Sequence, residues 1–475
     1  MGTTRIAGVL EKRLGIAAID DPAIVRLYSR EPSGLEGRGV AVVFPESVED
    51  LSKIARYAYK NEVPIYPQGS SSDLVGGAVP DREGLIISFE RMNRILGISL
   101  GDTLVDVEPG VRLGDLNVEL AEKGYMFPVD PGSVSIATVG GAINSGAGGL
   151  RGAKYGVMRD WVLGLTIVLP DSEGSILRIG CRTLKCRQGY DLVRLIIGSE
   201  GTLALVGEAT LRITPVPENV VTGLGFYRSL EDLAETVVRI KESGVQPLVM
   251  EFMDERTASI AARVVGSRIP VEGHMLLVGV DVNHEATDRY AEWLRKVMTE
   301  MGAGSVYIAR TSREAEEMKL YEIRRNLFPA QLAKALETRR GTSRIIAYME
   351  DISVPPTKVP DAVRLLRELE ERVGLEMFLG GHIGDGNLHP AVAYTADQEG
   401  IGERVEEWHM EVMRIALKLG GTVSSEHGIG LLKKKGLEME MELLGSLKAI
   451  ELMRGIKRIF DPKGILNPGK VVDPE

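Results

Sequence analysis

Cysteine is almost absent from this chain. Of its 475 residues, only Cys181 and Cys186 are cysteines. Two cysteines cannot build the disulfide framework of a small secreted domain, and they cannot supply the four thiolates of an iron–sulfur cluster. Their spacing is not C-x-x-C, so we expect structural or inert thiols.

Long apolar runs and an excess of basic charge are also missing. No run of 18 apolar residues exists, the first residues lack an apolar signal segment, and Ile6 interrupts a myristoylation pattern. The net charge is −10, which gives nucleic-acid binding no electrostatic support. We therefore expect a cytoplasmic protein without a nucleic-acid partner. Peripheral attachment at the inner face of the membrane is the alternative location.

Glycine, in contrast, is abundant and clustered. The chain holds 55 glycines, gathered mainly in residues 69–84, 132–156, 198–207, 380–386 and 420–430. A chain of this length is expected to form two or three domains, each with its own core. The segments between the clusters are periodic, so the glycines mark loops between regular elements.

The periodic segments predict an α+β protein. Ser47 opens a helix with Asp50 three positions later, an acidic variant of the capping box. Prolines and turn formers at residues 214–221 mark a domain boundary. Beyond it, strands and helices indicate an antiparallel sheet with helices on one face. The expected strands are 63–66, 85–89, 104–107, 161–169, 221–227, 248–253 and 275–280, and the later helices are 230–242, 286–301, 313–336, 357–373, 404–419 and one from 437.

Two glycine-rich loops of the first half point to a ligand. Residues 67–77, "PQGSSSDLVGG", directly follow a strand, and residues 130–157 carry many more glycines. Small side chains leave backbone N–H groups open to phosphate oxygens. The alternative for either loop alone is a pair of tight turns. Together they favour a large phosphate-bearing ligand.

Two nucleotide-binding motifs are excluded. No G-x-G-x-x-G stands between a strand and a helix, which disfavours a dinucleotide fold of the Rossmann type. Residues 464–471, "GILNPGKV", imitate a phosphate-binding P-loop up to Lys470 but then place Val471 where a metal-binding hydroxyl is needed.

The order of the motifs resembles the flavin-dependent 2-hydroxy-acid dehydrogenases. The motifs, from residue 67 onward, are "PQGSSSDLVGG", "DPGSVSIATVGG", "GAGGLRGAKYGVMRD", "GSEGTLALV", "GHIGDGNLHP", "SSEHGIG" and "FDPKGILNPGK". The family has the vanillyl-alcohol-oxidase type of FAD fold (the PCMH type), and the similar branch holds D-lactate dehydrogenase and the glycolate oxidase catalytic subunit. The resemblance runs from about residue 20 to the C-terminus.

The resemblance implies a domain division. Residues 1–216 would form the FAD-binding domain from two α+β subdomains, and residues 217–430 a cap domain that binds substrate. Residues 431–475 would form a C-terminal helical segment that returns to the FAD domain and completes its site.

The resemblance also implies which residues contact FAD. The first loop would wrap the pyrophosphate, the second would contact ribose and isoalloxazine, residues 200–206 would lie near the adenosine half, and the tail would close over the flavin. The residues are Pro67, Gly69, Ser70, Ser71, Ser72, Asp73, Leu74, Pro131, Gly132, Thr138, Gly140, Gly141, Ser145, Gly148, Gly149, Tyr155, Glu200, Gly201, Val206 and Asn467. Serines replace glycines that relatives often carry in the first loop, but they keep the N–H donors. Neither loop offers a His or Cys for attachment, so we expect noncovalent FAD.

The histidines His382 and His389 lie seven positions apart in a glycine-rich turn. Such a pair alone is more often structural than metal-ligating. The neighbours Glu426 and His427 add a carboxylate and a titratable ring, and two imidazoles with one carboxylate suit zinc or manganese. In metal-containing members of the family the corresponding ligands are His382, His389 and Glu426. The glycines would let both rings face one ion.

This set fits the oxidation of a 2-hydroxy acid. A divalent metal acidifies the substrate hydroxyl, hydride leaves for flavin N5, and His427 accepts the hydroxyl proton. Arg324 matches a substrate-carboxylate arginine of the family, with Arg325 as the alternative register and a solvated helix arginine as the structural alternative. Asn387 is expected to add a hydrogen bond. We name His427, Arg324 and Asn387 as catalytic.

The sequence indicates less about the substrate and the electron acceptor than about the cofactor. Met349 stands where family members that act on 2-hydroxyglutarate carry a lysine, which favours D-lactate or glycolate. The alternatives are a D-2-hydroxyglutarate-type dehydrogenase, a transferase like the flavin-dependent alkylglycerone-phosphate synthases, and a non-catalytic FAD-binding subunit of a multi-chain oxidase. Electrons would pass to a quinone, a cytochrome, an electron-transfer flavoprotein or an iron–sulfur partner subunit, and a homodimer is compatible with the sequence.

Overall fold

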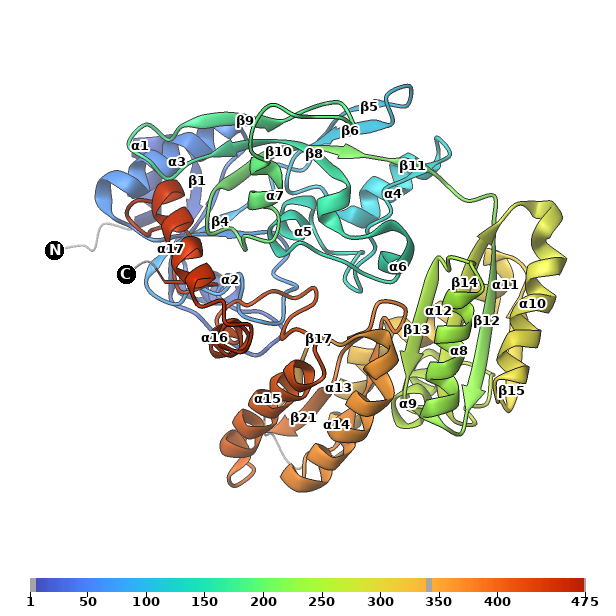
Figure 1. The fold of residues 1–475 in the computed structure, drawn as a ribbon. Helices are drawn as coiled ribbons and strands as arrows, with labels where there is room; N and C mark the ends of the chain where they lie inside the picture. The colour runs from blue at the N-terminus through green and yellow to red at the C-terminus, as the bar shows by residue number, and fades with distance from the viewer. Residues whose placement is uncertain (1–5, 339–343, 474–475) are drawn as a thin grey trace. The chain divides into compact units, whose positions relative to one another are not determined.

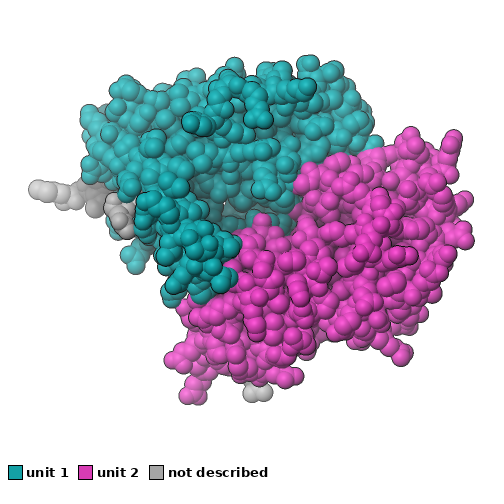
Figure 2. Space-filling view, viewed as in Figure 1, with its two compact units in different colours: residues 1–148, 157–216, 426–475 teal, residues 149–156, 217–425 magenta. Residues whose placement is uncertain are grey.

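The structure is a computed structural model that describes residues 6–338 and 344–473. It is mixed helix and sheet, about 39% helical and 22% strand, so the α+β prediction is confirmed. The chain forms two compact units, which Figure 2 colours separately. Unit 1 comprises residues 1–148, 157–216 and 426–475, and unit 2 comprises residues 149–156 and 217–425.

The first sheet of unit 1 carries the first glycine loop. Its strand order is β1-β2-β4-β3, with β2, β4 and β3 parallel. The strands are β1 (Ala17–Ile19), β2 (Gly39–Phe44), β3 (Ile65–Gln68) and β4 (Gly84–Ser88). Helix α3 (Val48–Asn61) begins after Ser47, whose hydroxyl accepts a hydrogen bond from the Asp50 amide at 3.2 Å, so the predicted cap is confirmed. Its apolar stripe packs on this sheet together with Ile465 and Leu466 of the C-terminal tail.

The second sheet of unit 1 is antiparallel, in the order β5-β6-β10-β8-β9. Its strands are β5 (Ile95–Ser99), β6 (Leu104–Val107), β8 (Val162–Val168), β9 (Ile176–Gly180) and β10 (Leu205–Arg212). Just after β9, Cys181 and Cys186 form a disulfide. The expectation of two separate thiols was therefore wrong, because the loop brings the two Cα atoms to 5.9 Å, inside the range that a disulfide needs.

The main sheet of unit 2 is antiparallel, as predicted, in the order β15-β12-β14-β13-β19 (Figure 1). Its strands are β12 (Asn219–Tyr227), β13 (Val249–Met253), β14 (His274–Val282), β15 (Ser305–Ala309) and β19 (Gly380–Gly381). Helices α8 (Leu230–Glu242) and α10 (Thr287–Glu300) were expected from periodicity. Helix α9 (Glu255–Val265) was not expected, although Asp254 caps it by accepting from the Thr257 amide at 2.7 Å.

Smaller elements complete unit 2. Strands β16 (Ile345–Met349), β21 (Ala391–Thr395) and β18 (Met377–Phe378) form a second sheet, and β17 (Ile352–Ser353) pairs with β20 (Asn387–Leu388). Two long helices, α14 (Val359–Val373) and α15 (Ile401–Lys418), contact each other.

Two predicted helices are divided in the structure. The segment expected as one helix over 313–336 is α11 (Ser312–Glu317), α12 (Leu320–Arg325) and α13 (Leu327–Thr338). Lys319, with a left-handed φ of 57°, separates α11 from α12, and Asn326 separates α12 from α13. In unit 1, the helix expected from 437 is a pair, α16 (Lys434–Leu443) and α17 (Lys448–Phe460), separated at Gly445 with φ 64°. Within the described ranges, every helix is too short or too polar to cross a bilayer.

Candidate active site

Unit 1 brings the two glycine loops together. A Cβ added at Gly69 would overlap Thr138 Oγ1, and it would lie 3.6 Å from the Cα of Gly141. Ser72 Oγ and Ser133 Oγ, one from each loop, are 3.4 Å apart. Thr138 also caps helix α5 (Val139–Ser145) through the Gly141 amide at 3.2 Å. The loops therefore form one surface of exposed backbone, as a flat, phosphate-bearing cofactor requires.

The C-terminal tail anchors the first loop. Asn467 donates from Nδ2 to the carbonyl oxygens of Gly77 at 2.9 Å and Glu200 at 2.6 Å, and it is 1% exposed. Lys470 donates to the Val79 carbonyl and lies over the Tyr66 ring at 4.8 Å. Burial lowers the pKa of Lys470 to about 8. These hydrogen bonds fix the side chain of Asn467, the residue predicted to close over the flavin.

Glu200 connects the segment that follows His427 to the rest of unit 1. Its carboxylate accepts from the amides of Ile429 at 2.6 Å and Gly430 at 2.7 Å. Burial raises the pKa of Glu200 to about 7, which these two donors oppose. Because both donors lie two or three positions after His427, Glu200 restricts where that histidine can lie in unit 1.

Glu426 and His427 begin the last segment of unit 1. A Cβ at Gly148 of the second glycine loop would lie 2.9 Å from Glu426 Oε2, so this loop and Glu426 are in close contact. His427 Nε2 lies 4.0 Å from Glu426 Oε1. Partial burial raises the pKa of Asp73 in the first loop, and the charge of His427 opposes the rise. Both residues therefore adjoin the loops predicted to hold FAD.

Unit 2 holds the histidine turn, residues 380–390. Its glycines are required by neighbouring backbone: a Cβ at Gly381 would overlap the Asn387 carbonyl oxygen, and a Cβ at Gly386, where φ is +86°, would overlap the Val354 carbonyl oxygen. The His389 amide donates to the Gly380 carbonyl at 2.7 Å, which closes the turn. Lys241 of α8 donates to the Gly384 carbonyl at 2.7 Å. The turn is consequently compact and held from outside.

The two imidazoles of this turn lie side by side. The His382 and His389 ring centroids are 5.3 Å apart with the planes at 89°, and one nitrogen of each ring lies within 4.8 Å of the other. The side chains are 7% and 5% exposed. Two buried imidazoles at this separation fit a divalent cation between them.

Glu251 of β13 contacts both His382 and Arg324. His382 Nδ1 lies 2.7 and 2.9 Å from the two oxygens of Glu251, and Arg324 Nε of α12 forms an ion pair with Oε2 at 2.6 Å. Arg324 is 6% exposed, and its buried Nε and Nη2 have no hydrogen-bond partner among the described residues, so Nε meets Glu251 as an ion pair only. A buried guanidinium with a donor to spare suits an anionic ligand.

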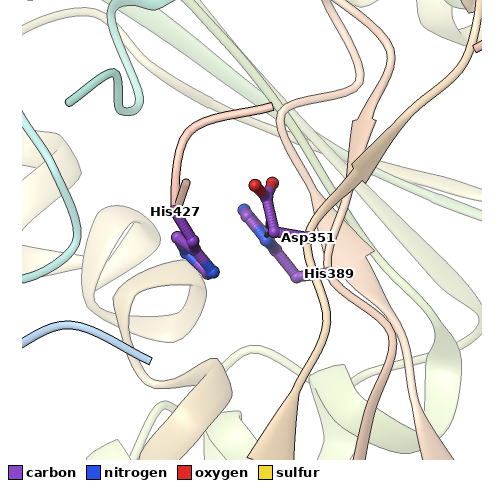
Figure 3. Close-up of side chains that lie close together, drawn as sticks. All are labelled: Asp351, His389 and His427. Atoms are coloured by element: carbon purple, nitrogen blue, oxygen red, sulfur yellow. Dashed lines mark ion pairs between the residues drawn. The ribbon is translucent and has the colours of Figure 1, made fainter. Parts of the chain in front are cut away.

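Asp351 organises the other side of the turn. Its Oδ1 accepts from Asn387 Nδ2 at 2.6 Å and lies 3.8 Å from His389 Nδ1 (Figure 3). Its Oδ2 accepts from the Ser425 amide at 2.8 Å and the Ser424 hydroxyl at 3.2 Å. Asp351 therefore joins the histidine turn to the end of the "SSEHGIG" segment. His427, also drawn in Figure 3, belongs to unit 1.

Asn387 has one amide atom left for a ligand. Its Nδ2 donates to Asp351 and to the Ile352 carbonyl at 3.1 Å, whereas its buried Oδ1 has no partner within the described residues. The side chain can therefore accept a hydrogen bond but has no donor to offer a carboxylate.

Sequence reasoning missed Glu251 and Asp351. Glu251 is the single charged residue of the apolar strand "VMEFM", and a charge at a strand position expected to be buried was the available signal. Asp351 follows another buried strand in the same way. Gly149 and Tyr155, two of the expected FAD contacts, belong to unit 2, where Leu150 packs with Leu248 and Val249.

The comparisons with known proteins agree with this architecture. Residues 40–180 match the family described as an FAD binding domain, and residues 216–471 match that described as FAD linked oxidases, C-terminal domain. The glycolate oxidase subunit GlcD of Bacillus subtilis is 37% identical over 432 residues, 91% of this chain and 88% of the relative. A D-lactate dehydrogenase of Archaeoglobus fulgidus is 36% identical over 434 residues, 91% of each chain.

A solved structure confirms the fold. The 4-ethylphenol oxidase from Gulosibacter chungangensis matches with a TM-score of 0.76 at 18% identity, over 96% of this chain and 94% of that one. At that identity the likeness concerns the fold alone. Since the family match spans more than half of the chain and the relatives cover nearly all of it, the resemblance seen in the motifs is confirmed: the chain belongs to the FAD-linked oxidases and is an FAD-dependent 2-hydroxy-acid oxidoreductase.

Proposed function

We propose that this enzyme oxidises a short D-2-hydroxy monocarboxylate, D-lactate or glycolate, to the 2-oxo acid, and that it uses a zinc or manganese ion held by His382, His389 and Glu426. The observation that carries the proposal is the pair of buried imidazoles with centroids 5.3 Å apart. One nitrogen of each ring lies within 4.8 Å of the other, and two adjacent imidazoles are ligands that suit a divalent cation.

Chain connectivity supports Glu426 as the third ligand. The Ser425 amide is hydrogen-bonded to Asp351, and Asp351 lies beside His389 within unit 2. Glu426 directly follows Ser425 in the chain, so its backbone continues from a residue that Asp351 holds. Two imidazoles and one carboxylate leave positions open for substrate oxygens.

The two groups supply distinct chemistry when bound. A divalent cation there lowers the pKa of the substrate hydroxyl, and FAD, noncovalently bound, takes up the hydride that leaves the substrate carbon. The chain provides orientation and the movement of the proton.

The protein residues then have separate roles. His427 accepts the hydroxyl proton, and the Asp73 carboxylate lies close enough for the two side chains to interact electrostatically. Arg324 binds the substrate carboxylate through Nη2, which has no hydrogen-bond partner among the residues that the structure describes. Asn387 accepts a hydrogen bond at Oδ1, which suits a hydroxyl or a water molecule rather than the carboxylate.

The substrate size follows from Met349. This residue ends strand β16 and is 8% exposed, and it offers no charge to a second carboxylate. We expect faster reduction of dichlorophenolindophenol with D-lactate than with D-2-hydroxyglutarate. The opposite preference would refute the Met349 argument and favour the 2-hydroxyglutarate alternative.

Metal removal tests the rest of the proposal. Chelation followed by gel filtration should abolish dye reduction while the flavin absorbance stays, and added zinc or manganese should restore turnover. Full activity in metal-free protein would contradict the role of the ion. Anaerobic bleaching of the flavin by D-lactate separates an oxidoreductase from a transferase or a non-catalytic subunit, neither of which would bleach.

The electrons leave the flavin for an acceptor other than NAD. A quinone, a cytochrome, an electron-transfer flavoprotein and an iron–sulfur partner subunit are the candidates, because this chain has two cysteines and they form a disulfide.

A further inference from the structure

Glu251 is a fully buried carboxylate at the centre of strand β13. It is 0% exposed, and its neighbours in the strand, Met250 and Phe252, are apolar and buried. Its two oxygens lie 2.7 and 2.9 Å from His382 Nδ1, and Oε2 lies 2.6 Å from Arg324 Nε. One carboxylate therefore touches an expected metal ligand and the expected substrate-binding arginine.

We propose that Glu251 is the positioning residue of this site: it fixes His382 as a metal ligand and aims Arg324 at the substrate carboxylate. The inference rests on the proposed function, since it concerns the same metal and the same substrate group. It adds a physical link between the two binding events.

The first half of the argument concerns the tautomer of His382. A carboxylate can only accept, so the hydrogen bond at Nδ1 requires the proton to be on Nδ1. The lone pair then lies on Nε2, the nitrogen on the opposite edge of the ring. A carboxylate behind a histidine is the usual way in which proteins fix ring orientation and raise the basicity of a metal ligand.

The register of the main sheet makes this contact rigid. Phe252, next to Glu251, pairs with Gly381 of β19, and Gly381 directly precedes His382. On its other side β13 pairs with β14, where Glu251 faces Leu277. Glu251 therefore projects from β13 and His382 directly follows the paired strand β19, so a shift of either backbone would disturb this pairing.

The second half concerns Arg324. Its guanidinium is planar, so an ion pair at Nε determines where the two Nη groups point. Nε and Nη2 are both buried without a hydrogen-bond partner within the described part of the chain, so Glu251 holds Nε as an ion pair and Nη2 is left for an anion. Glu251 also compensates the buried positive charge, which otherwise would be costly. The arginine is thus held by one edge and presents its remaining donors to an anion.

The test uses the Glu251→Gln variant of the whole flavoprotein. Glutamine keeps the volume, but its Nε2 is a donor and cannot face both His382 Nδ1–H and Arg324. Zinc or manganese affinity is measured by titration calorimetry after chelation, and oxalate binding to metal-free protein is followed by the flavin spectrum. We expect metal binding to weaken 10- to 100-fold, the range typical of such partners, and oxalate binding to weaken about tenfold.

A matched control is Glu370→Gln. Glu370 is also a unit 2 carboxylate with two arginine partners, Arg256 and Arg367, and both lie outside the histidine turn. It should lower thermal stability without changing either affinity. The double variant Glu251→Gln/His382→Ala should bind metal no more weakly than His382→Ala alone, because the carboxylate acts through that ring.

The outcomes separate the two levels of the proposal. Wild-type protein that binds metal and oxalate, with both affinities within threefold in Glu251→Gln, would overturn the positioning role alone. Wild-type protein that binds no metal would overturn the proposed function and this inference together. Additive losses in the double variant would also overturn it, since they would mean that Glu251 acts independently of His382.

Discussion

The glycine loops of unit 1 and the histidine turn of unit 2 are both rich in glycine, but they use it differently. In the loops, glycine leaves backbone amides exposed to a ligand, as at Gly69 against Thr138. In the turn, glycine lets the backbone fold on itself, as at Gly381 and Gly386, and the proposed binding groups are side chains. A backbone site is therefore sensitive to added side-chain volume, whereas a side-chain site is sensitive to the loss of a functional group.

The buried carboxylates that hold the two regions in place also differ. Carboxylates of unit 1, such as Glu200, accept from backbone amides, whereas Glu251 and Asp351 of unit 2 contact the side chains of the site. We therefore expect that damage to unit 2 affects turnover and leaves the flavin bound, and that damage to the loops affects the flavin first.

The largest effect is expected for His389→Ala. Loss of this ring removes a proposed metal ligand, so kcat should fall by about 10³-fold or more while FAD content stays at one per chain. Steady-state dye reduction and the flavin absorbance per protein check both halves. Loss of FAD from this variant would break the distinction between the two regions.

Arg324→Lys is expected to have the next largest effect. Lysine keeps the charge but loses the planar fork, so KM for D-lactate should rise about 10- to 100-fold with a smaller change in kcat. The neighbouring Arg325→Lys is the control, and it decides the register. If Arg325→Lys raises KM more than Arg324→Lys does, the carboxylate assignment moves by one residue.

Gly69→Val tests whether the glycine loops of unit 1 determine the affinity for FAD. The added carbons would overlap Thr138 Oγ1 and push the two loops apart, so the FAD dissociation constant should rise about 20-fold. Gly97→Ala in β5 is the control, since its Cβ would meet nothing within 4 Å. Equal FAD affinity in Gly69→Val and wild type would contradict the proposed role of the loop contact.

The smallest effect concerns Glu31, which accepts from the Gly76 amide of the first loop at 2.5 Å. Burial raises the pKa of Glu31 to about 8. Between about pH 4.5 and 8 the folded state then holds a proton that the unfolded state has released, so the free energy of unfolding falls as pH rises. Glu31→Gln should remove this part of the slope and gain about 2 kcal/mol on wild type between pH 6 and 8.

Urea unfolding at several pH values measures this difference. If the difference in free energy of unfolding between wild type and Glu31→Gln stays constant across that range, the pKa of the Glu31 carboxyl is not raised. At any pH where both proteins are folded, Glu31→Gln and wild type should have the same kcat for D-lactate.

Local signals in the sequence predicted much of the fold. The capping pair Ser47 and Asp50 and the apolar period of α8 depend on residues three or four positions apart, so they can be read directly. Lys319 shows where such reading fails: its left-handed backbone divides a segment whose composition is helical throughout. Left-handed conformation at a lysine is imposed by packing and has no local signature.

The candidate site could be predicted only as far as its motifs extend. His382 and His389 share one turn, and their proximity follows from its seven-residue spacing. Glu251 is 131 positions away from His382 and comes together with it only through the pairing of β13 with β19. Contacts created by sheet register are invisible to a reading along the chain.

The short segment 149–156 has a consequence for protein engineering. It lies within the second glycine loop, yet it is part of unit 2, where Lys154 pairs with Asp281 at 2.5 Å and Leu150 fills an apolar pocket beside Val249. A substrate unit cut out as residues 217–425 would therefore expose that pocket and leave Asp281 without its cation. Chimeras designed to exchange substrate preference between relatives should therefore replace residues 149–156 together with residues 217–425.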